Sequence, residues 1–172
     1  MKKQIRKIAP NEAPILSEIA VKTFVESHGA SASATDIQAY IAEKYTVQQF
    51  ENELNNPANL YYFICVDEQI AGFSKLVMNV PFNEQSESNF AKQERLYLLE
   101  EFYDLKLGHE LFQFNCELAK QDSQKGIWLF VWTGNQRAIR FYTKAGFEIV
   151  GSHNFKISEN HSNPNHQMLL EL

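Results

Sequence analysis

The chain has 172 residues, a length that fits one domain. Hydrophobic residues make up 44% of it and charged residues 22%, which is the composition of a folded globular protein rather than of a disordered one. The formal net charge is −5 and no basic stripe is visible, so the sequence argues against nucleic-acid binding and favours a small cationic partner.

The sequence shows no sign of export or of membrane insertion. Its first ten residues, MKKQIRKIAP, lack the apolar core of a signal peptide, and no apolar run is long enough to span a bilayer. We therefore expect a cytoplasmic protein with no membrane contact.

The cysteines and histidines give no metal-ligand pattern. Cys65 and Cys116 lie in separate apolar runs and are expected to be buried thiols. His153, His161 and His166 are scattered without tight spacing, so no metal site is expected.

The first part of the chain is predicted to form one strand followed by helices. Gln4 to Ile8 has the pattern of a short strand. Asn11 is expected to cap a first helix that runs through Phe24, because apolar residues follow at helical spacing. The remaining boundaries are a polar loop at Ser27 to Ala34, helix starts at Thr35-Asp36 and Thr46, and a helix end at Asn56-Pro57.

Residues 60–99 change to the composition of strands. Leu60 to Val66 and Ile70 to Val80 are rich in aromatic and branched residues, and Asp67-Glu68-Gln69 between them is typical of a hairpin turn. A polar loop, Pro81 to Ala91, precedes a further strand at Gln93 to Leu99. These strands predict a meander of three.

The last part of the chain alternates between helices and strands. Helices are predicted at Lys106 to Asp122 and at Gln136 to Ala145, the second followed by a glycine suited to a helix C-terminus. Strands are predicted at Gly126 to Trp132, Glu148 to Ile157 and His166 to Leu172. The whole order predicts one domain with a mixed α/β sheet.

Two segments carry the signals for chemistry, and the first is Glu94 to Phe112. It has the pattern of a strand, a short turn and the start of a helix. A helix N-terminus offers free N–H groups and a positive dipole end, which suit a pyrophosphate. The residues alone leave open that this is an ordinary β–α connection.

The second segment, Ile127 to Phe147, is more specific. Asn135 opens a helix directly after a strand, and Ala138 is small enough for a ligand to approach closely. Phe141-Tyr142 lies near the end of that helix, before Gly146-Phe147 leads into the next strand.

Together the two segments resemble the GNAT superfamily of N-acetyltransferases. The pattern N-x-x-A-x-x-F-Y-x-x-x-G-F is complete, and the first segment is similar to the family's acyl-CoA pyrophosphate loop, R/Q-x-x-G-x-G/A. The phrases ERLY, IWLFVW and GFEIVGSHNF make the chain most similar to PaiA-type spermidine/spermine N-acetyltransferases. The resemblance implies a GNAT fold over residues 1–172, with mostly antiparallel N-terminal strands and a central strand–helix–strand–helix acyl-CoA site.

The resemblance also implies acetyl-CoA as co-substrate and no metal. The loop departs from the family pattern, since Tyr103 stands where Gln or Arg is usual and Lys106 where the first Gly is usual. Lys106 is either a cation beside the phosphates or a solvated surface lysine. The residues expected to contact CoA are Leu96, Tyr97, Leu98, Leu99, Tyr103, Asp104, Leu105, Lys106, Leu107, Gly108, His109, Glu110, Asn135, Ala138 and Tyr142.

The reaction implied is direct attack of an amine on a thioester. A lysine-like amine has a pKa of about 10.4, so its neutral form costs about 4.6 kcal/mol at pH 7. Glu94, on the strand beside the thioester, is the candidate to accept the proton, with an ordinary surface glutamate as the alternative. Tyr142 is the candidate acid for the leaving thiolate, with a packing role as the alternative, and Asn135 either binds the pantetheine arm or caps its helix.

The acceptor is predicted to be a small cationic amine, such as a polyamine. Phe24, Glu26, Tyr40 and Glu43 lie in the early helices, where the family builds its acceptor pocket, and offer carboxylates and aromatic faces to a cation. Two alternatives stay open: a protein or peptide amine as acceptor, and a regulatory protein that binds acyl-CoA with little turnover. His28, in the predicted loop, either lines the acceptor pocket or is a plain surface histidine. A homodimer through the late strands is also considered.

Overall fold

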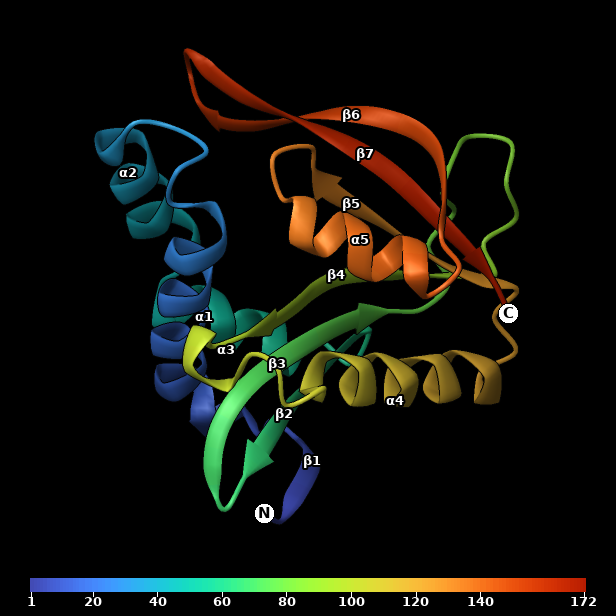
Figure 1. The fold of residues 1–172 in the computed structure, drawn as a ribbon, viewed down its shortest axis with the longest axis horizontal. Coiled ribbons are helices and arrows are strands. Elements are labelled where there is room, and N and C mark those ends of the chain that lie inside the picture. Colours follow the sequence, from blue (N-terminus) through green and yellow to red (C-terminus); the bar gives the residue numbers. More distant parts are fainter.

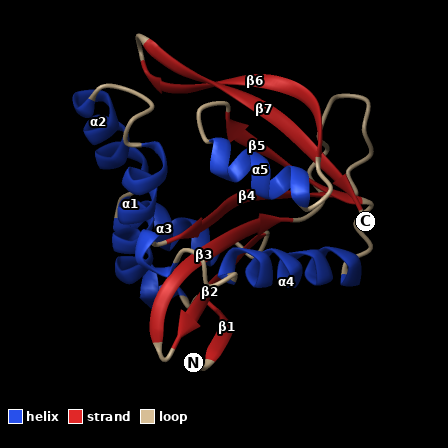
Figure 2. Cartoon of the chain, in the orientation of Figure 1, coloured by secondary structure: helices blue, strands red, loops and turns tan.

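A computed structural model describes all residues, 1–172, as one mixed sheet of seven strands covered by helices on both faces (Figures 1 and 2). The strand order is β1-β2-β3-β4-β5-β7-β6. The strands are β1 (Lys3–Lys7), β2 (Asn59–Val66), β3 (Gln69–Val77), β4 (Phe90–Leu98), β5 (Gly126–Trp132), β6 (Glu148–Ser158) and β7 (His161–Glu171). The helices are α1 (Ala13–His28), α2 (Ala34–Lys44), α3 (Val47–Asn55), α4 (Leu107–Gln121) and α5 (Gln136–Lys144), with 3-10 turns at Pro10–Glu12 and Glu100–Phe102.

Side-chain alternation along β2 decides which helices cover which face. Tyr61, Phe63 and Cys65 pack into a cluster with residues of α1, α2 and α3. Ile64 and Val66, one position out of phase, pack instead with residues of α4. Because successive side chains of a strand point to opposite faces, one strand joins two cores and fixes α1–α3 and α4 on opposite sides of the sheet.

The predicted mixed α/β fold is confirmed, and all pairs but one are antiparallel. The exception is the parallel pair of β4 and β5, which is the pair predicted to flank the acyl-CoA site. Parallel strands need a long crossover connection, and α4 supplies it. No helix has the length and apolarity that crossing a membrane requires.

Several predicted boundaries were wrong because tertiary pairing overrode local composition. The polar segment from His161 to Asn165 belongs to β7, since it pairs with β6 as far as Ser158 opposite His161. β4 begins at Phe90, where pairing with β5 starts, and β3 ends at Val77 rather than Val80.

The ends of the first two helices also differ from the prediction. Asn11 does not cap α1, because it lies in a 3-10 turn and α1 begins at Ala13 without a side-chain cap. At its other end α1 continues to His28, so Ser27 is helical and not part of a loop. α2 begins one residue before Thr35 and is capped by Ser33, whose Oγ accepts from Asp36 N at 3.1 Å.

The hairpin between β2 and β3 has a left-handed turn without glycine. Asp67 and Glu68 have φ of 47° and 72°, the backbone of a two-residue type I′ turn that favours Asn-Gly. Asp67 also accepts a hydrogen bond from Lys2 N at 2.7 Å, whereas no side-chain bond involves Glu68.

We predict that Glu68→Gly raises the free energy of unfolding by about 1 kcal/mol, because glycine lacks the Cβ that clashes in this conformation. Thermal melts should show an increase in Tm of about 2–4 °C. Gln113→Gly, an exposed position within α4, is the control and should lower Tm. A Glu68→Gly protein that melts below wild type would contradict the prediction.

Candidate active site

A cavity of about 1070 Å³ opens where β4 and β5 separate. The two strands pair at only three positions, Phe90–Lys92 opposite Gly126–Trp128, and then diverge (Figure 1). Residues of α1, α2, β4 to β7, the loop before α4, the first turn of α4 and α5 line the cavity. Beyond the last pair, backbone groups that would otherwise bond to the neighbouring strand are available to a ligand.

A β-bulge in β4 lies just past the point of separation. Lys75 pairs with Arg95 and the next residue, Leu76, pairs with Gln93, so Glu94 is the extra residue of the bulge. A bulge bends its strand and changes the direction of its side chains. The bend therefore accompanies the divergence of β4 from β5 and places Glu94 at the cavity.

Glu94 is held by cations. Lys75 Nζ lies 2.5 Å from Glu94 Oε2 and 2.9 Å from Glu53 Oε2, and the Lys75 side chain is only 8% exposed. Burial by itself would raise the pKa of the Glu94 carboxyl, but the hydrogen bond and charge of Lys75 outweigh burial and lower it. Glu94 is therefore an ionised carboxylate of reduced basicity.

Arg95, the next residue, is partly buried on the other side of the bulge, with its side chain 16% exposed. Its NH1 lies 2.6 Å from Tyr61 Oη and 3.4 Å from Glu53 Oε2, and its guanidinium packs over the rings of Tyr45 and Phe50. With Lys75 and Glu94 it completes a compact set of two cations and two carboxylates below the cavity. Such balance is what allows these charges to be buried.

Tyr142, near the end of α5, presents a protonated hydroxyl. The residue is 8% exposed and lines the cavity, and its ring packs against Phe112 and Phe147. Burial raises the pKa of Tyr142, and no hydrogen bond from another residue offsets it. The O–H is therefore intact at neutral pH and is available to a ligand.

The loop before α4 takes the left-handed backbone that glycines usually supply. Asp104 and Lys106 have φ of 68° and 60°. The first N–H groups of α4, those of Leu107, Gly108 and His109, precede the first intrahelical bond, Glu110 N to Lys106 O. Lys106, which stands where the family pattern usually has its first glycine, thus adopts a backbone conformation that favours glycine.

Gly108 keeps the approach to these N–H groups open. A Cβ added there would meet only Leu98 Cδ1 at 3.5 Å and Phe141 Cε2 at 3.9 Å, which are ordinary contacts. Packing of the protein therefore does not require glycine here. The free N–H groups, the positive helix end and the absence of a Cβ fit a phosphate group.

Arg137 is a cation that sequence reasoning missed. Its guanidinium lies 3.2 Å from the centroid of the Tyr103 ring, and both residues line the cavity. Tyr103 occupies the loop position where the family usually has Gln or Arg, so Arg137 brings a cation from α5 to that position. No local pattern indicates this contact, since the two residues come from separate elements.

Asn135 caps α5. Its Oδ1 accepts a hydrogen bond from Ala138 N at 3.1 Å, so the capping role is observed. The residue also lines the cavity, together with Ala138.

The part of the cavity toward α1 and α2 is aromatic. His28 stacks on Phe24 with ring centroids 5.1 Å apart, and Phe24 stacks on Tyr40 at 5.3 Å. His28 also lies 6.0 Å from the rings of Tyr97 and Trp132. Burial lowers the pKa of His28 to about 4, so the imidazole is neutral at pH 7 and is not the surface histidine of the plain alternative.

Two carboxylates and two amides complete this part. Glu26 Oε2 accepts from Glu100 N at 2.9 Å, and Asp104 lines the cavity near it. Asn163 and Asn165, 2% and 8% exposed, approach from β7. They were missed because β7 was predicted to begin only at His166.

Most of the predicted site residues come together in the cavity, but four do not line it. Leu99 is buried and donates to Ala71 O, and Leu105 packs against the cluster of α4. Glu110 pairs with Lys3, and Glu43 is a solvated residue beside Lys44. The predicted residues that line the cavity are Phe24, Glu26, Tyr40, Glu94, Leu96, Tyr97, Leu98, Tyr103, Asp104, Lys106, Leu107, Gly108, His109, Asn135, Ala138 and Tyr142.

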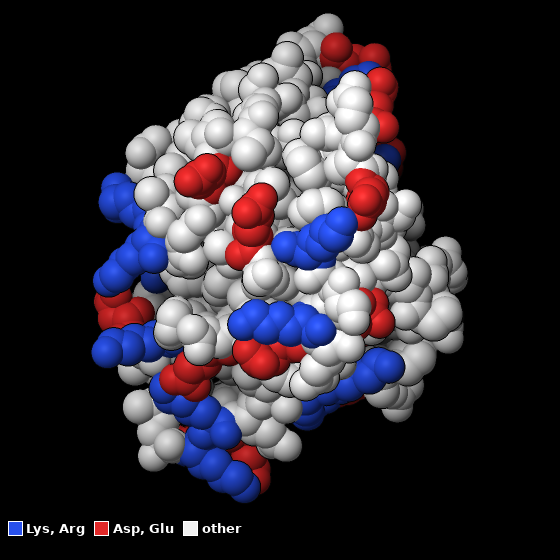
Figure 3. Space-filling view, turned by 90° about the vertical axis from the view of Figure 1, so that its right-hand side faces the viewer, with Lys and Arg blue, Asp and Glu red and all other residues white.

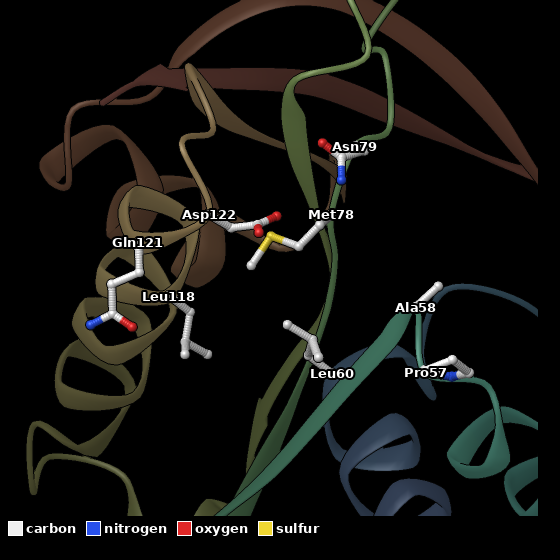
Figure 4. Close-up of a pocket in the computed structure, with 8 residues that line it drawn as sticks. All are labelled: Pro57, Ala58, Leu60, Met78, Asn79, Leu118, Gln121 and Asp122. Carbon is white, nitrogen blue, oxygen red and sulfur yellow. The ribbon is translucent and has the colours of Figure 1, made fainter.

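A second, open pocket of about 490 Å³ lies between the last turn of α4 and the ends of β2 and β3 (Figure 4). Leu60, Leu118 and Met78 give it an apolar floor. Two of its polar side chains, Asn79 and Asp122, accept hydrogen bonds from Gln124.

The structure gathers no three His, Cys, Asp or Glu side chains that would hold a metal ion. Figure 3 shows one face of the molecule, on which acidic and basic side chains are interspersed. Lys75, the most buried charged residue, belongs instead to the set around Glu94.

Comparison with known proteins identifies the family of this chain. The sequence model of the family described as "Acetyltransferase (GNAT) family" matches residues 21–147, most of the chain. An uncharacterized N-acetyltransferase encoded in the pepI 3′ region of Lactobacillus delbrueckii subsp. lactis is 28% identical over 156 residues, 91% of this chain and 90% of that protein. A spermidine N(1)-acetyltransferase of Thermoplasma acidophilum is 28% identical over 153 residues, 85% of this chain and 88% of its own.

Solved structures share the fold. The PaiA N-acetyltransferase from Thermoplasma acidophilum in complex with coenzyme A has a TM-score of 0.81 at 23% identity, with both chains fully covered. A GCN5-related N-acetyltransferase from Rhodopseudomonas palustris has a TM-score of 0.79 at 16% identity, covering 100% of this chain and 97% of that one.

We predict that Lys106→Gly raises the free energy of unfolding by about 1 kcal/mol, because it relieves the left-handed backbone, whereas Lys106→Ala keeps that strain. Both changes remove the cation. If it lies beside the phosphates, both should weaken CoA binding more than binding of a pantetheine fragment without phosphates. Thermal melts measure the effect on stability, and titration calorimetry measures the effect on affinity. Equal changes in affinity for the two ligands would mean that Lys106 is a solvated surface lysine that does not contact the phosphates.

Proposed function

The chain belongs to the GNAT family of acetyltransferases and is an acetyl-CoA-dependent N-acetyltransferase, and we propose that its acceptor is a primary amine of a small cation of the polyamine class. The observation that carries the acceptor proposal is an aromatic wall beside an ionised carboxylate in one cavity. The half-buried ring of Tyr40, with Phe24 stacked behind it, offers a cation–π contact, and Glu94 offers a negative charge. The spermidine N(1)-acetyltransferase relative supports the same class.

The opposite end of the cavity suits CoA. The free N–H groups of Leu107 to His109 would receive the pyrophosphate, with Lys106 and Arg137 as neighbouring cations. The open edge of β4 from Leu96 to Leu98 would bond to the pantetheine arm. We propose that the thioester then lies between Glu94 and Tyr142, which line the same cavity.

The proposed transfer is a direct attack. The acceptor nitrogen forms a bond to the acetyl carbonyl carbon, the carbon–sulfur bond breaks, the amine loses a proton and the CoA sulfur leaves as a thiolate. Glu94 has a lowered pKa, so it is a poor base for an ammonium of pKa about 10.4. We propose that it attracts the ammonium and orients a water that carries the proton away.

Tyr142 would act on the leaving sulfur. A thiol has an ordinary pKa of about 8.5, while the pKa of Tyr142 is raised above its ordinary value of about 10. Complete proton transfer from Tyr142 to the thiolate is therefore uphill. Its O–H would stabilise the developing negative charge on the sulfur by a hydrogen bond. The thiolate would then take its proton from water.

The proposed acceptor is tested with a panel of amines. Release of free thiol from acetyl-CoA should be fastest with spermidine or a related polyamine, and saturating acetyl-CoA at about 100 times its Kd should stabilise the fold by about 2.7 kcal/mol. Turnover only with peptide amines would exclude the polyamine class. Stabilisation without turnover on any amine would indicate a regulatory acyl-CoA-binding protein.

We predict that Tyr142→Phe lowers kcat by about 10²-fold while the fold and the affinity for acetyl-CoA change little, because only the hydroxyl is removed. The loss should shrink for thioesters with a more acidic thiol, which need less stabilisation. Tyr62→Phe, on β2 against Phe114, is the matched control and should keep the wild-type rate. Wild-type turnover by Tyr142→Phe would make this tyrosine a packing residue.

Two further expectations stay predictions: a homodimer through β6 and β7, and location in the cytoplasm.

A further inference from the structure

A buried side-chain amide spans the bulge of β4. Gln93 is 3% exposed, and its Nε2 donates to Lys75 O on β3 at 3.0 Å and to Arg95 O on β4 at 2.7 Å. These carbonyls belong to the paired residues next to Glu94, the extra residue of the bulge. Because a bulge disrupts the ladder of backbone hydrogen bonds, the Gln93 amide supplies bonds that tie the two strands together there.

The amide is held in turn by α4. Asn115 is fully buried in the middle of α4, and its Nδ2 donates to Gln93 Oε1 at 2.8 Å. Ser74 Oγ donates to Asn115 Oδ1 at 3.3 Å. A chain of side-chain hydrogen bonds therefore runs from the helix that begins at the phosphate loop, through Gln93, to the bulge.

The bulge gives the residues on its two sides opposite directions. In an unbroken strand Gln93 and Arg95 would face the same side of the sheet. Here Gln93 meets Asn115 of α4, whereas Arg95 packs on Tyr45 and Phe50 on the other face. Glu94 lies between these two anchored residues.

Apolar side chains would fill the space between β4 and α4 without needing partners. Burying an amide costs free energy unless its hydrogen bonds are made. When they are made, they hold the bonded groups in one arrangement. This network fixes the backbone of the bulge and thereby the orientation of the Glu94 carboxylate.

We propose that Gln93 and Asn115 are positioning residues that hold the β4 bulge, and with it Glu94, in the geometry needed for acetyl transfer. The inference rests on the proposed function. It also predicts a division of roles, in which α4 binds phosphates at its first turn and supports the transfer site from its middle.

The test compares Gln93→Met and Asn115→Leu with Val66→Ala. Gln93→Met keeps the side-chain length and removes the amide, and Asn115→Leu keeps the volume and favours the helix, so it provides a second test if Gln93→Met does not fold. Val66→Ala creates a cavity at the hairpin end of β2, opposite Gln69 and away from the bulge, and serves as the control for lost stability. Each protein is assayed well below its own Tm for kcat, for the Kd of CoA and for hydrogen exchange of the amides in residues 93–98.

We expect both network variants to lower kcat by about 10²-fold, the effect of displacing a reacting group by about 1 Å, with little change in the Kd of CoA. Exchange in residues 93–98 should be faster in these variants and unchanged in Val66→Ala, which should keep the wild-type kcat. Network variants with wild-type kcat and exchange would overturn the inference, as would an equal loss of kcat in Val66→Ala. If the wild-type protein acetylates no amine, the proposed function is wrong. Hydrogen exchange would then still decide whether Gln93 and Asn115 hold the bulge.

Discussion

The site depends on two neighbouring strands that stop pairing. β4 and β5 are parallel partners over three positions and then separate, which leaves backbone groups without strand partners at the centre of the sheet. A sheet interrupted in this way needs support, because buried backbone groups must find other partners. The protein provides it through the Gln93 amide at the bulge, which donates to Lys75 O and Arg95 O, and through a cavity in which a bound ligand can take the place of the missing strand contacts.

Charge around the bulge follows from the same constraint. The Glu94 carboxylate is partly buried at the cavity. A charge there needs a partner of opposite sign, and Lys75 provides it. Lys75 is shared with Glu53, which also accepts from Tyr61 and meets Arg95. The consequence for chemistry is a carboxylate that stays ionised. It is better suited to attracting a cation and ordering water than to removing a proton directly from an ammonium.

The loop before α4, the proposed phosphate site, shows how one backbone conformation can be reached by different residues. Glycine is the usual choice for a left-handed turn because it lacks a Cβ, yet Lys106 adopts it here. Tyr103, which replaces the usual polar residue, is covered by Arg137 from α5. The chemistry expected of the loop, free N–H groups and nearby positive charge, is thereby retained although its sequence pattern is incomplete.

The sequence by itself determined the α/β class, the order of elements and the family, because periodicity and the N-x-x-A-x-x-F-Y-x-x-x-G-F pattern are local properties of the chain. It also indicated Tyr142, Gly108 and Glu94 as candidates, and the structure brings them to one cavity. Only the tertiary structure decided that polar residues from His161 to Asn165 form a strand, that Arg137 reaches Tyr103, and that Gln93 joins α4 to the bulge. Each of these depends on contacts between elements far apart in the chain, where pairing and burial outweigh the preferences of the residues themselves.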